Sequence, residues 1–454
     1  MALPPSGSER PDHHTAAFGV SEVLGDTVIG GALLSSEDQI VDGTISGDAA
    51  TYPPLRHGVI AFAFLMVAEF FYSWAWNSID VLRPYIRESL GLTLTEVGSG
   101  YSAQGAGALI GAVIIGQLAD RFGRRAMLTM VMVGYGVSLI AGTFAGSYPM
   151  FLLARFVLGL FMGGIFPIVV GIYVGLFAAN VAGRLAAMIN AIFGSALTLL
   201  GYASGALNGD WHTLLWLGGV PPILLAGLAF VLIPPSADAR RMRDEAPTVA
   251  PIAELFAPAV RRQTLMLAAL MGLNFFGYQA FGGWQTTYLR DVRHLTPTVM
   301  GDLVAMQFAA NIIGGFFWGW AGDRFGRRFN ALGFVATAAA IALYLNLGSG
   351  AALLGVVGAC YGFMLSSSVV WGPWLTELYP PHLKSTAASI FNWGRIVSFF
   401  APLITGALAA KVGLGLTMGL GSVTFLIAGV LWLLLPETHP APLLPALRKS
   451  PADR

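Results

Sequence analysis

Twelve long apolar stretches run through this 454-residue chain, and they limit its possible folds more than any other feature. A helix needs about 20 apolar residues to cross the hydrocarbon core of a bilayer. Stretches of this kind lie at 58–84, 97–118, 126–146, 150–178, 184–207, 211–233, 264–289, 298–320, 329–348, 351–376, 386–410 and 414–435. Only 11% of the residues are charged, which is unusual for a soluble protein of this length. The sequence therefore predicts an all-α membrane protein with 12 transmembrane helices.

A short phrase occurs twice, as GQLADRFGRR at 116–125 and as GWAGDRFGRR at 319–328, and each copy closes an apolar stretch. The surrounding segments 104–125 and 307–328 are identical at 11 of 22 positions. An internal repeat of this kind predicts two halves of six helices each. The expected divisions are a tail at 1–56, a first bundle at 57–233, a linker at 234–263, a second bundle at 264–436 and a tail at 437–454.

The distribution of Lys and Arg predicts the orientation of the chain. Eighteen of them fall in the N-terminal tail, the even-numbered loops and the C-terminus, whereas the opposite side holds five: Arg83, Arg87, Arg290, Arg293 and Lys411. By the positive-inside rule both termini are cytosolic, in a plasma (inner) membrane. The N-terminal tail is polar and lacks the apolar core of a signal peptide, so it is expected to be disordered. In the linker, a short amphipathic helix is expected through Leu255 and Phe256.

Both copies of the phrase fall in short cytosolic turns, between helices 2 and 3 and between helices 8 and 9. Glycine permits a tight turn, and an Asp beside several Arg can form charge-assisted bonds to neighbouring helix ends. The positive-inside rule alone explains the charge but not an identical hexapeptide at matched positions. The residues expected to form two latches are Gly116, Asp120, Arg121, Gly123, Arg124, Arg125, Asp323, Arg324, Gly326, Arg327, Arg328, Glu377 and Lys384.

The doubled phrase resembles the signature loop of the major facilitator superfamily, and the helix count, the linker position and the inward termini agree with that family. The resemblance implies two six-helix bundles that rock about a central site, with the loops closing the cytosolic face in one state. The segments ARFVLGLFMGGIFP at 154–167 and ELYPPHLKSTAASIFNWGRI at 377–396 add to it. The second resembles the helix 10 to 11 junction of proton-coupled aromatic-acid, sialate and lactate carriers, and more loosely that of sugar porters.

The two halves differ from each other and from those carriers. Where the second half has Glu377 and Lys384, the first has Gly175 and Ala182, so the first latch lacks part of its charge network unless Arg184 substitutes. Organic-acid carriers of this kind usually have two aspartates in helix 1. An ungapped comparison places 72–75 at that motif, so the acid pair is absent there.

Glu69, Asp80 and Arg155 are the candidates for proton coupling. A charge at bilayer depth is costly, and it usually faces a cavity or a partner. Glu69 and Asp80 are 11 residues apart, which places them on one face of helix 1. Glu69 lies deeper and is the preferred candidate, because Asp80 near the outer surface could simply be paired or solvated. For Arg155 the resemblance implies a conformational or proton-linked role.

Arg395 is a candidate for binding the substrate, because a planar guanidinium can hold a carboxylate by two hydrogen bonds. An internal ion pair or a backbone contact that holds helix 11 is an equally acceptable role. Six other polar or aromatic residues within helices are further candidates: Gln104, Asn190, Gln279, Gln307, Trp371 and Asn392. Gln104 with Gln307, and Asn190 with Asn392, occupy equivalent positions of the repeat. Amides can also join helices, and Trp is common at membrane interfaces.

The sequence has no phosphate-binding Gly-x-x-x-x-Gly-Lys loop, no HExxH motif and no Cys/His metal spacing, and Cys360 is its single cysteine. Neither an enzyme nor a cofactor or metal site is predicted, and the net charge of +1 gives no footprint for nucleic acid. The leading prediction is a monomeric carrier in the lipid bilayer. It would take up a small organic anion (an aromatic acid, a sugar acid or a monocarboxylate) with protons, by alternating access. The alternatives are an efflux carrier for amphipathic compounds, a neutral sugar porter and, less favoured, a membrane sensor. Efflux branches typically have Gly-Pro-x-x-Gly-Gly in helix 5, where this chain has FGSALTLLGYASG.

Overall fold

The computed structural model describes residues 55–177, 182–234, 252–348, 350–380, 383, 386–387 and 389–438. All of them belong to one compact unit, Tyr52–Arg454. Most of the predicted N-terminal tail, the linker at 235–251 and the C-terminal tail from 439 lie outside the described residues. The described residues are helical, with no strand among them.

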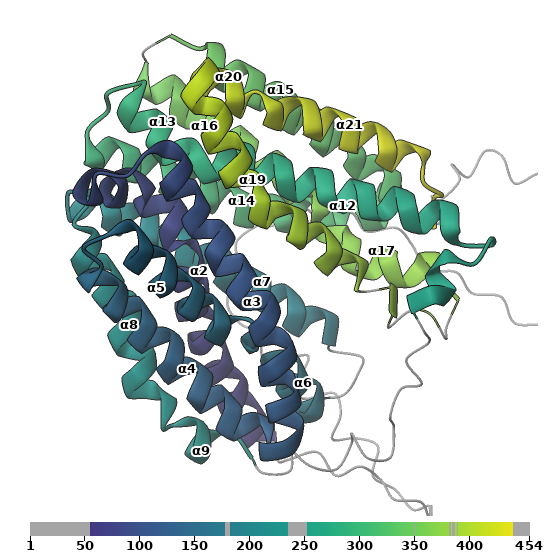
Figure 1. Ribbon diagram of the computed structural model, residues 1–454. Helices are drawn as coiled ribbons and strands as arrows, with labels where there is room; N and C mark the ends of the chain where they lie inside the picture. Colours follow the sequence, from purple (N-terminus) through teal and green to yellow (C-terminus); the bar gives the residue numbers. More distant parts are fainter. Residues whose placement is uncertain are drawn as a thin grey trace, which may run out of the picture. The chain divides into compact units, whose positions relative to one another are not determined.

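The first half consists of helices that follow the first six apolar stretches. They are α2 (Leu55–Leu90), α3 (Leu94–Phe122), α4 (Arg124–Ala141) with η1 (Gly142–Phe144), α5 (Tyr148–Met162), α6 (Ile165–Leu176), α7 (Ala182–Ala206), α8 (Trp211–Ala226) and α9 (Ala229–Leu232). The fourth predicted helix is interrupted between α5 and α6 at Gly163 and Gly164, just before the proline of the GGIFP segment. In Figure 1 these helices lie together, coloured purple to teal.

The second half repeats the pattern after the short 3₁₀ helix η3 (Ile252–Phe256), which lies where the amphipathic linker helix was predicted. Its elements are α12 (Arg261–Phe281), η4 (Gly282–Trp284), α13 (Gln285–Asp291), α14 (Pro297–Phe325), η5 (Arg327–Asn330), α15 (Ala331–Asn346), α16 (Ala351–Leu365), η6 (Ser366–Val370), α17 (Trp371–Leu378), α19 (Ile390–Val412), α20 (Leu414–Met418) and α21 (Leu420–Leu434). These helices form the green-to-yellow group in Figure 1.

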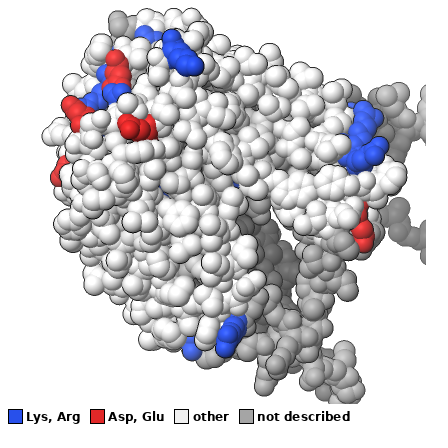
Figure 2. Space-filling view, in the orientation of Figure 1, with Lys and Arg blue, Asp and Glu red and all other residues white. Residues whose placement is uncertain are grey.

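The predicted membrane fold is confirmed. In the described part of the chain, nine helices are long and apolar enough to span a membrane, and three shorter apolar helices, Tyr148–Met162, Ala191–Ala206 and Trp211–Ala226, fall on three further predicted stretches. Charged side chains on the visible face lie toward its edges, and a broad uncharged surface lies between them (Figure 2). That uncharged surface is what lipid tails require of a membrane protein.

The internal repeat is visible in the helix boundaries. α3 runs from residue 94 to 122 and α14 from 297 to 325, so the two helices keep the spacing of the repeated phrase at both ends. α3 packs against α19 of the second half, and α14 packs against α7 of the first. These two equivalent helix pairs form the seam between the halves.

Glycines let the helices within each half approach closely. A Cβ at Gly159 of α5 would lie 1.9 Å from the carbonyl oxygen of Gln104 in α3, and one at Gly111 would lie 1.8 Å from that of Leu160. In the second half, a Cβ at Gly362 would lie 2.1 Å from the carbonyl oxygen of Gln307. Small residues at these positions allow van der Waals packing of backbone on backbone, which stabilises helix pairs in lipid.

Candidate functional site

The second copy of the repeated phrase forms a compact charge network. The guanidinium of Arg327 donates to Asp323 at 2.7 Å and to Oε1 of Glu377 in α17 at 2.8 Å. Gly326 has φ 99°, and the turn that it makes points two backbone amides, of Arg327 and Arg328, at the carboxylate of Glu437 at 2.8 Å each. Glu437 was not predicted as a latch residue, because its position just after the last helix gives no signal of this contact.

The first copy makes different bonds. Gly123 again has positive φ, 89°, but Arg124 donates to the carbonyl of Gly171 at 2.5 Å and Arg125 donates to the carbonyls of Phe230 and Ile233 at 3.3 Å each. At Gly116 in α3, a Cβ would have no atom within 4 Å. The guanidinium of Arg121 lies 5.3 Å from the ring centre of Phe122. The exposed Arg324 follows Asp323 in α14. The side chains of Asp120, Arg184 and Lys384 lie outside the described residues, so their latch roles stay predictions.

Glu69, in the middle part of α2, and Arg395, in the second turn of α19, interact electrostatically across the seam. The Glu69 side chain is buried, and among the described residues its Oε1 has no hydrogen-bond partner. Arg395, which is half-buried, is the cation that acts on Glu69 electrostatically, and it also interacts with the hydroxyl of Tyr72. The guanidinium lies 5.3 Å from the ring centre of Trp76, in cation–π contact. An acid from one half and a base from the other are therefore held next to aromatic rings.

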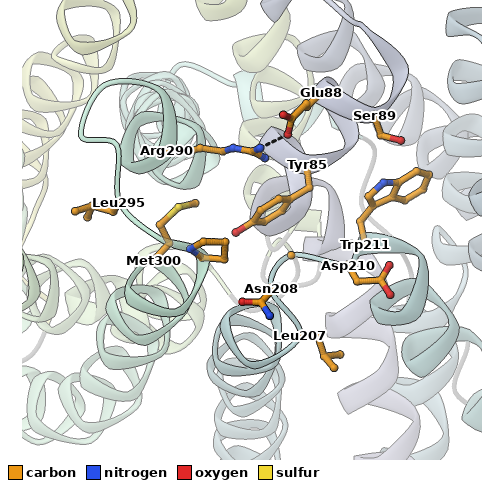
Figure 3. Close-up of a pocket in the computed structure, with 12 residues that line it drawn as sticks. Tyr85, Glu88, Ser89, Leu207, Asn208, Asp210, Trp211, Arg290, Leu295 and Met300 are labelled. Atoms are coloured by element: carbon orange, nitrogen blue, oxygen red, sulfur yellow. Dashed lines mark hydrogen bonds and ion pairs between the residues drawn. The ribbon is translucent and has the colours of Figure 1, made fainter.

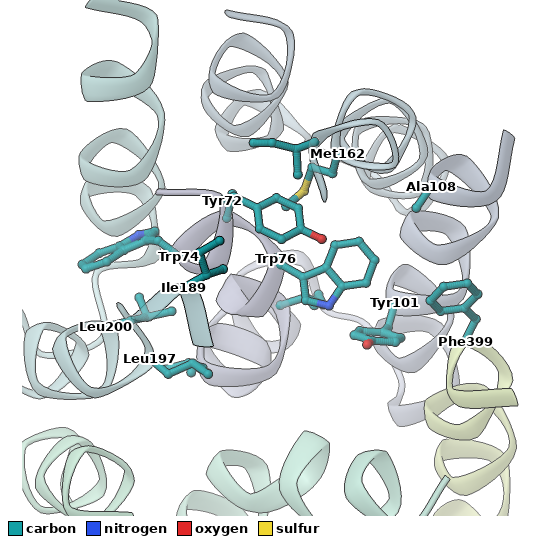
Figure 4. Packing of buried hydrophobic residues seen from close by; sticks show 14 of the residues in the cluster. Tyr72, Trp74, Trp76, Tyr101, Ala108, Met162, Ile189, Leu197, Leu200 and Phe399 are labelled. Carbon is teal, nitrogen blue, oxygen red and sulfur yellow. The ribbon is translucent and has the colours of Figure 1, made fainter. Parts of the chain in front are cut away.

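Aromatic side chains from three helices line this position. The ring centres of Trp76 and Tyr101 lie 6.2 Å apart, and Phe399 lies 6.3 Å from each of them. Tyr72 lies 6.0 Å from Trp76. Figure 4 shows the four rings following one another from α2 through α3 to α19. The sequence did not predict this cluster, since an aromatic residue in an apolar helix does not reveal which helix it faces.

Asp80 belongs to a second buried cluster, nearer the end of α2. Its Oδ1 accepts from Arg83 at 2.6 Å and its Oδ2 from Gln279 of α12 at 3.2 Å. Arg155 donates to Ser78 at 3.1 Å and also acts on Asp80 electrostatically. The sequence counts Arg83 among the loop cations, but its side chain is fully buried, because α2 continues beyond the predicted end at 84 to Leu90.

A cavity of about 520 Å³ lies beyond this cluster, near the ends of α2 and α13 (Figure 3). Arg290 pairs with Glu88 at its wall and lies 4.9 Å from the ring centre of Tyr85. Nearby, Arg87 pairs with Asp291 at 2.6 Å. Asp210 caps α8 at the rim, and a hydrogen bond from the Thr213 hydroxyl lowers the pKa of this carboxyl. Asp210 therefore stays ionised at neutral pH.

The remaining predicted binding residues are dispersed. Gln104 is buried and donates to the carbonyl of Trp76 at 3.1 Å, beside the aromatic rings. Gln307 is buried within the second half, where it accepts from Gln285 at 2.6 Å. Trp371 packs at 5.3 Å from both Phe334 and Trp432, an arrangement that favours a packing role. The side chains of Asn190 and Asn392 lie outside the described residues, and both residues stay predictions.

Comparisons with known proteins agree with this architecture. A family model described as Major Facilitator Superfamily matches residues 65–298 and 267–453. The chain is 24% identical to a probable 4-methylmuconolactone transporter of Cupriavidus pinatubonensis, over 81% of this chain and 89% of that protein. It is 24% identical to a 4-hydroxybenzoate transporter of Acinetobacter baylyi, over 73% and 80%, and 24% identical to a gallate transporter of Pseudomonas putida, over 79% and 88%.

Solved structures show the same fold. The crystal structure of a bacterial homologue of the human lysosomal transporter Spinster, in an inward-facing and unoccupied conformation, superposes with a TM-score of 0.69 at 15% identity, over 84% of this chain and 97% of that one. A nucleoside transporter gives a TM-score of 0.68 at 12% identity, over 82% and 99%. The family match spans both six-helix halves. The chain is a multi-pass membrane protein and belongs to the Major Facilitator Superfamily.

Proposed function

We propose that this protein takes up a small organic anion, most simply an aromatic carboxylate, together with protons by alternating access. The observation that carries the proposal is the buried Glu69 of one half, which interacts electrostatically with the half-buried Arg395 of the other half beside aromatic rings. The transport of 4-hydroxybenzoate and gallate named for two relatives supports this substrate class. The DRFGRR end of the molecule is the cytosolic end in this proposal, in the inner membrane, and the carrier acts as a monomer.

Arg395 is the group that binds the substrate carboxylate. A guanidinium presents two parallel N–H donors to a carboxylate, which gives both energy and orientation. The position of Arg395 above Trp76 supports binding of the carboxylate at the edge of the rings of Trp76, Tyr101 and Phe399. An aromatic substrate can then pack on them in offset or edge-to-face contact. Gln104, bonded to the backbone at Trp76, fixes that part of the site.

Glu69 couples the proton through its competition for Arg395. Without substrate, Arg395 is the counter-charge for Glu69. When a substrate carboxylate takes that guanidinium, an ionised Glu69 remains buried with an incompletely compensated charge, which is costly in a low-dielectric interior. Uptake of a proton by Glu69 removes that cost. One anion and one proton are therefore bound together, and neither is favoured to cross alone.

Purified protein in proteoliposomes tests this function. Uptake of labelled 4-hydroxybenzoate is expected to be faster with an inward proton gradient than without one. A protonophore should return the uptake rate to the value measured without a gradient. A neutral sugar of similar size and a cationic dye are the controls for the sugar-porter and efflux alternatives. Accumulation of the sugar but not of the acid would contradict the proposal, as would acid uptake that does not respond to the gradient.

A further inference from the structure

Arg83 makes an unusual set of contacts for a buried charge. The side chain is fully buried near the end of α2, yet two of the groups that it contacts belong to the other half of the molecule. Nη1 donates to the backbone carbonyl of Gly283, and the guanidinium lies 4.4 Å from the ring centre of Trp284. Another partner, Asp80, lies on α2 itself at 2.6 Å. A buried arginine is tolerated only when such partners compensate its charge.

The acceptor on the other half is produced by an interruption in a helix. α12 and α13 are separated by the 3₁₀ segment Gly282–Trp284, and a 3₁₀ stretch within a long helix often marks a functional hinge. Gly283 lies close to its neighbours, since a Cβ there would be 2.3 Å from Oε1 of Gln279 and 3.4 Å from Nη1 of Arg83. Arg83 thus contacts the second half at the 3₁₀ segment, where the regular α-helical backbone of α12 and α13 is interrupted.

Further polar contacts cross the seam at this same end. The hydroxyl of Thr286 donates to the carbonyl of Asp80 at 2.8 Å, Gln279 donates to the Asp80 carboxylate, and Arg87 pairs with Asp291. By contrast, the latch bonds described above, such as Arg327 with Glu377, join groups of one half. The halves are therefore tied together at the end opposite the DRFGRR loops.

We propose that Arg83 is the tie that holds the outer side of this carrier closed, with Asp80 as its positioning residue. Opening that side separates α2 from the 3₁₀ segment, so Arg83 must leave Gly283 and Trp284. Asp80 is three residues before Arg83 on the same helix and moves with it. The guanidinium keeps this counter-charge in both states, which makes the tie reversible. The proposal uses alternating access from the proposed function but no property of the substrate.

Cysteine accessibility tests the tie without any substrate. Cys360, the single cysteine, is first replaced by Ser, and Ser102→Cys is introduced as a reporter. Ser102 lies in α3 and is partly buried, and its hydroxyl donates to the carbonyl of Phe399 across the seam at 2.6 Å, so separation of the halves on the outer side should expose it further. The rate of labelling by a membrane-impermeant maleimide is measured on intact cells. Total reporter is measured after denaturation, and monodispersity in detergent checks the fold.

Arg83→Gln is expected to raise the labelling rate about tenfold, because a charge-assisted bond that exists in one state only is lost. Arg83→Lys, which keeps the charge, is expected to label at an intermediate rate. Arg87→Gln is the matched control, since it removes a partly exposed cross-seam pair, and it is expected to change labelling less than twofold.

Gly283→Ala reaches the same contact from the second half, and it is decisive if Arg83→Gln is not monodisperse. It is expected to raise labelling in the same direction. If Arg83→Gln is monodisperse and its labelling rate is unchanged, the proposed role of Arg83 is wrong. If Arg83→Gln is not monodisperse, an unchanged rate in Gly283→Ala leads to the same conclusion. So does an equal increase in Arg87→Gln. Failure to accumulate an aromatic acid would overturn the proposed function but would leave these labelling rates as they are.

Discussion

At the scale of single residues, Arg395 and Glu69 are the groups whose chemistry should matter most. Replacing Arg395 by Lys keeps a cation but removes the two parallel donors that match a carboxylate. We expect Arg395→Lys to raise the KM for 4-hydroxybenzoate about tenfold or more, and Arg395→Gln to abolish measurable uptake in proteoliposomes. Arg261→Lys, an exposed change at the start of α12, is the control and should transport normally. Normal uptake by Arg395→Gln would remove this residue from the binding site.

Glu69→Gln keeps the shape of the side chain but cannot exchange a proton. In the proposed coupling this variant resembles the protonated carrier, so it should still bind substrate and exchange labelled for unlabelled acid across the membrane. Accumulation driven by an inward proton gradient should be lost. Counterflow and gradient-driven uptake are measured on the same vesicles, with Asp302→Asn, an exposed carboxylate of α14, as the control. Gradient-driven accumulation that persists in Glu69→Gln would assign coupling elsewhere.

How far the sequence predicts these residues depends on the contrast with their surroundings. Glu69 and Arg395 could be predicted because a charge within an apolar helix is rare and costly. Tyr101 and Phe399 could not, since an aromatic side chain is equally at home against lipid, within a bundle or on the seam. Arg83 was counted with the cations of the outer side because it lies at the end of the first apolar stretch, yet α2 continues past it to Leu90.

At the scale of helices, close packing explains more than hydrophobicity does. Gly159 of α5 has no room for a side chain, because a Cβ would lie 1.9 Å from the carbonyl oxygen of Gln104. We expect Gly159→Ala to destabilise the protein by about 1–3 kcal/mol, as overpacking usually does. The unfolding midpoint in detergent should fall by several degrees. Gly315→Ala is the matched control, since nothing lies within 4 Å of a Cβ there. Equal midpoints for both variants would mean that α3 and α5 can move apart freely.

Helices were easier to predict than their interruptions. The twelve apolar stretches all carry helices, because length and hydrophobicity suffice for a membrane span. The fourth apolar stretch is divided at its GGIFP segment, where α5 ends at Met162. The 3₁₀ segment at Gly282–Trp284 was not predicted, since it depends on tertiary contacts, including that of Arg83 with Gly283, between residues 200 positions apart.

At the scale of the whole molecule, the seam pairs α3 with α19 and α7 with α14, and the repeat makes the two pairs equivalent. Equivalent seams let either end of the molecule close in turn, so contacts at the two ends should act on one equilibrium in opposite directions. The tie at Arg83 belongs to the outer end in this scheme. The network of Arg327 with Asp323 and Glu377 belongs to the DRFGRR end.

A double variant tests this opposition. Arg83→Gln should raise the labelling of Ser102→Cys from outside. Arg327→Gln should lower it, because in the proposed carrier the latch formed by Asp323, Arg327 and Glu377 favours closure of the cytosolic side. If both residues bias a single two-state equilibrium, their free-energy effects add because the sites are far apart. The double variant should therefore label at a rate between those of the two single variants. Labelling of the double variant as fast as Arg83→Gln alone would mean that the two ends are not coupled, and that the DRFGRR network stabilises its own half only.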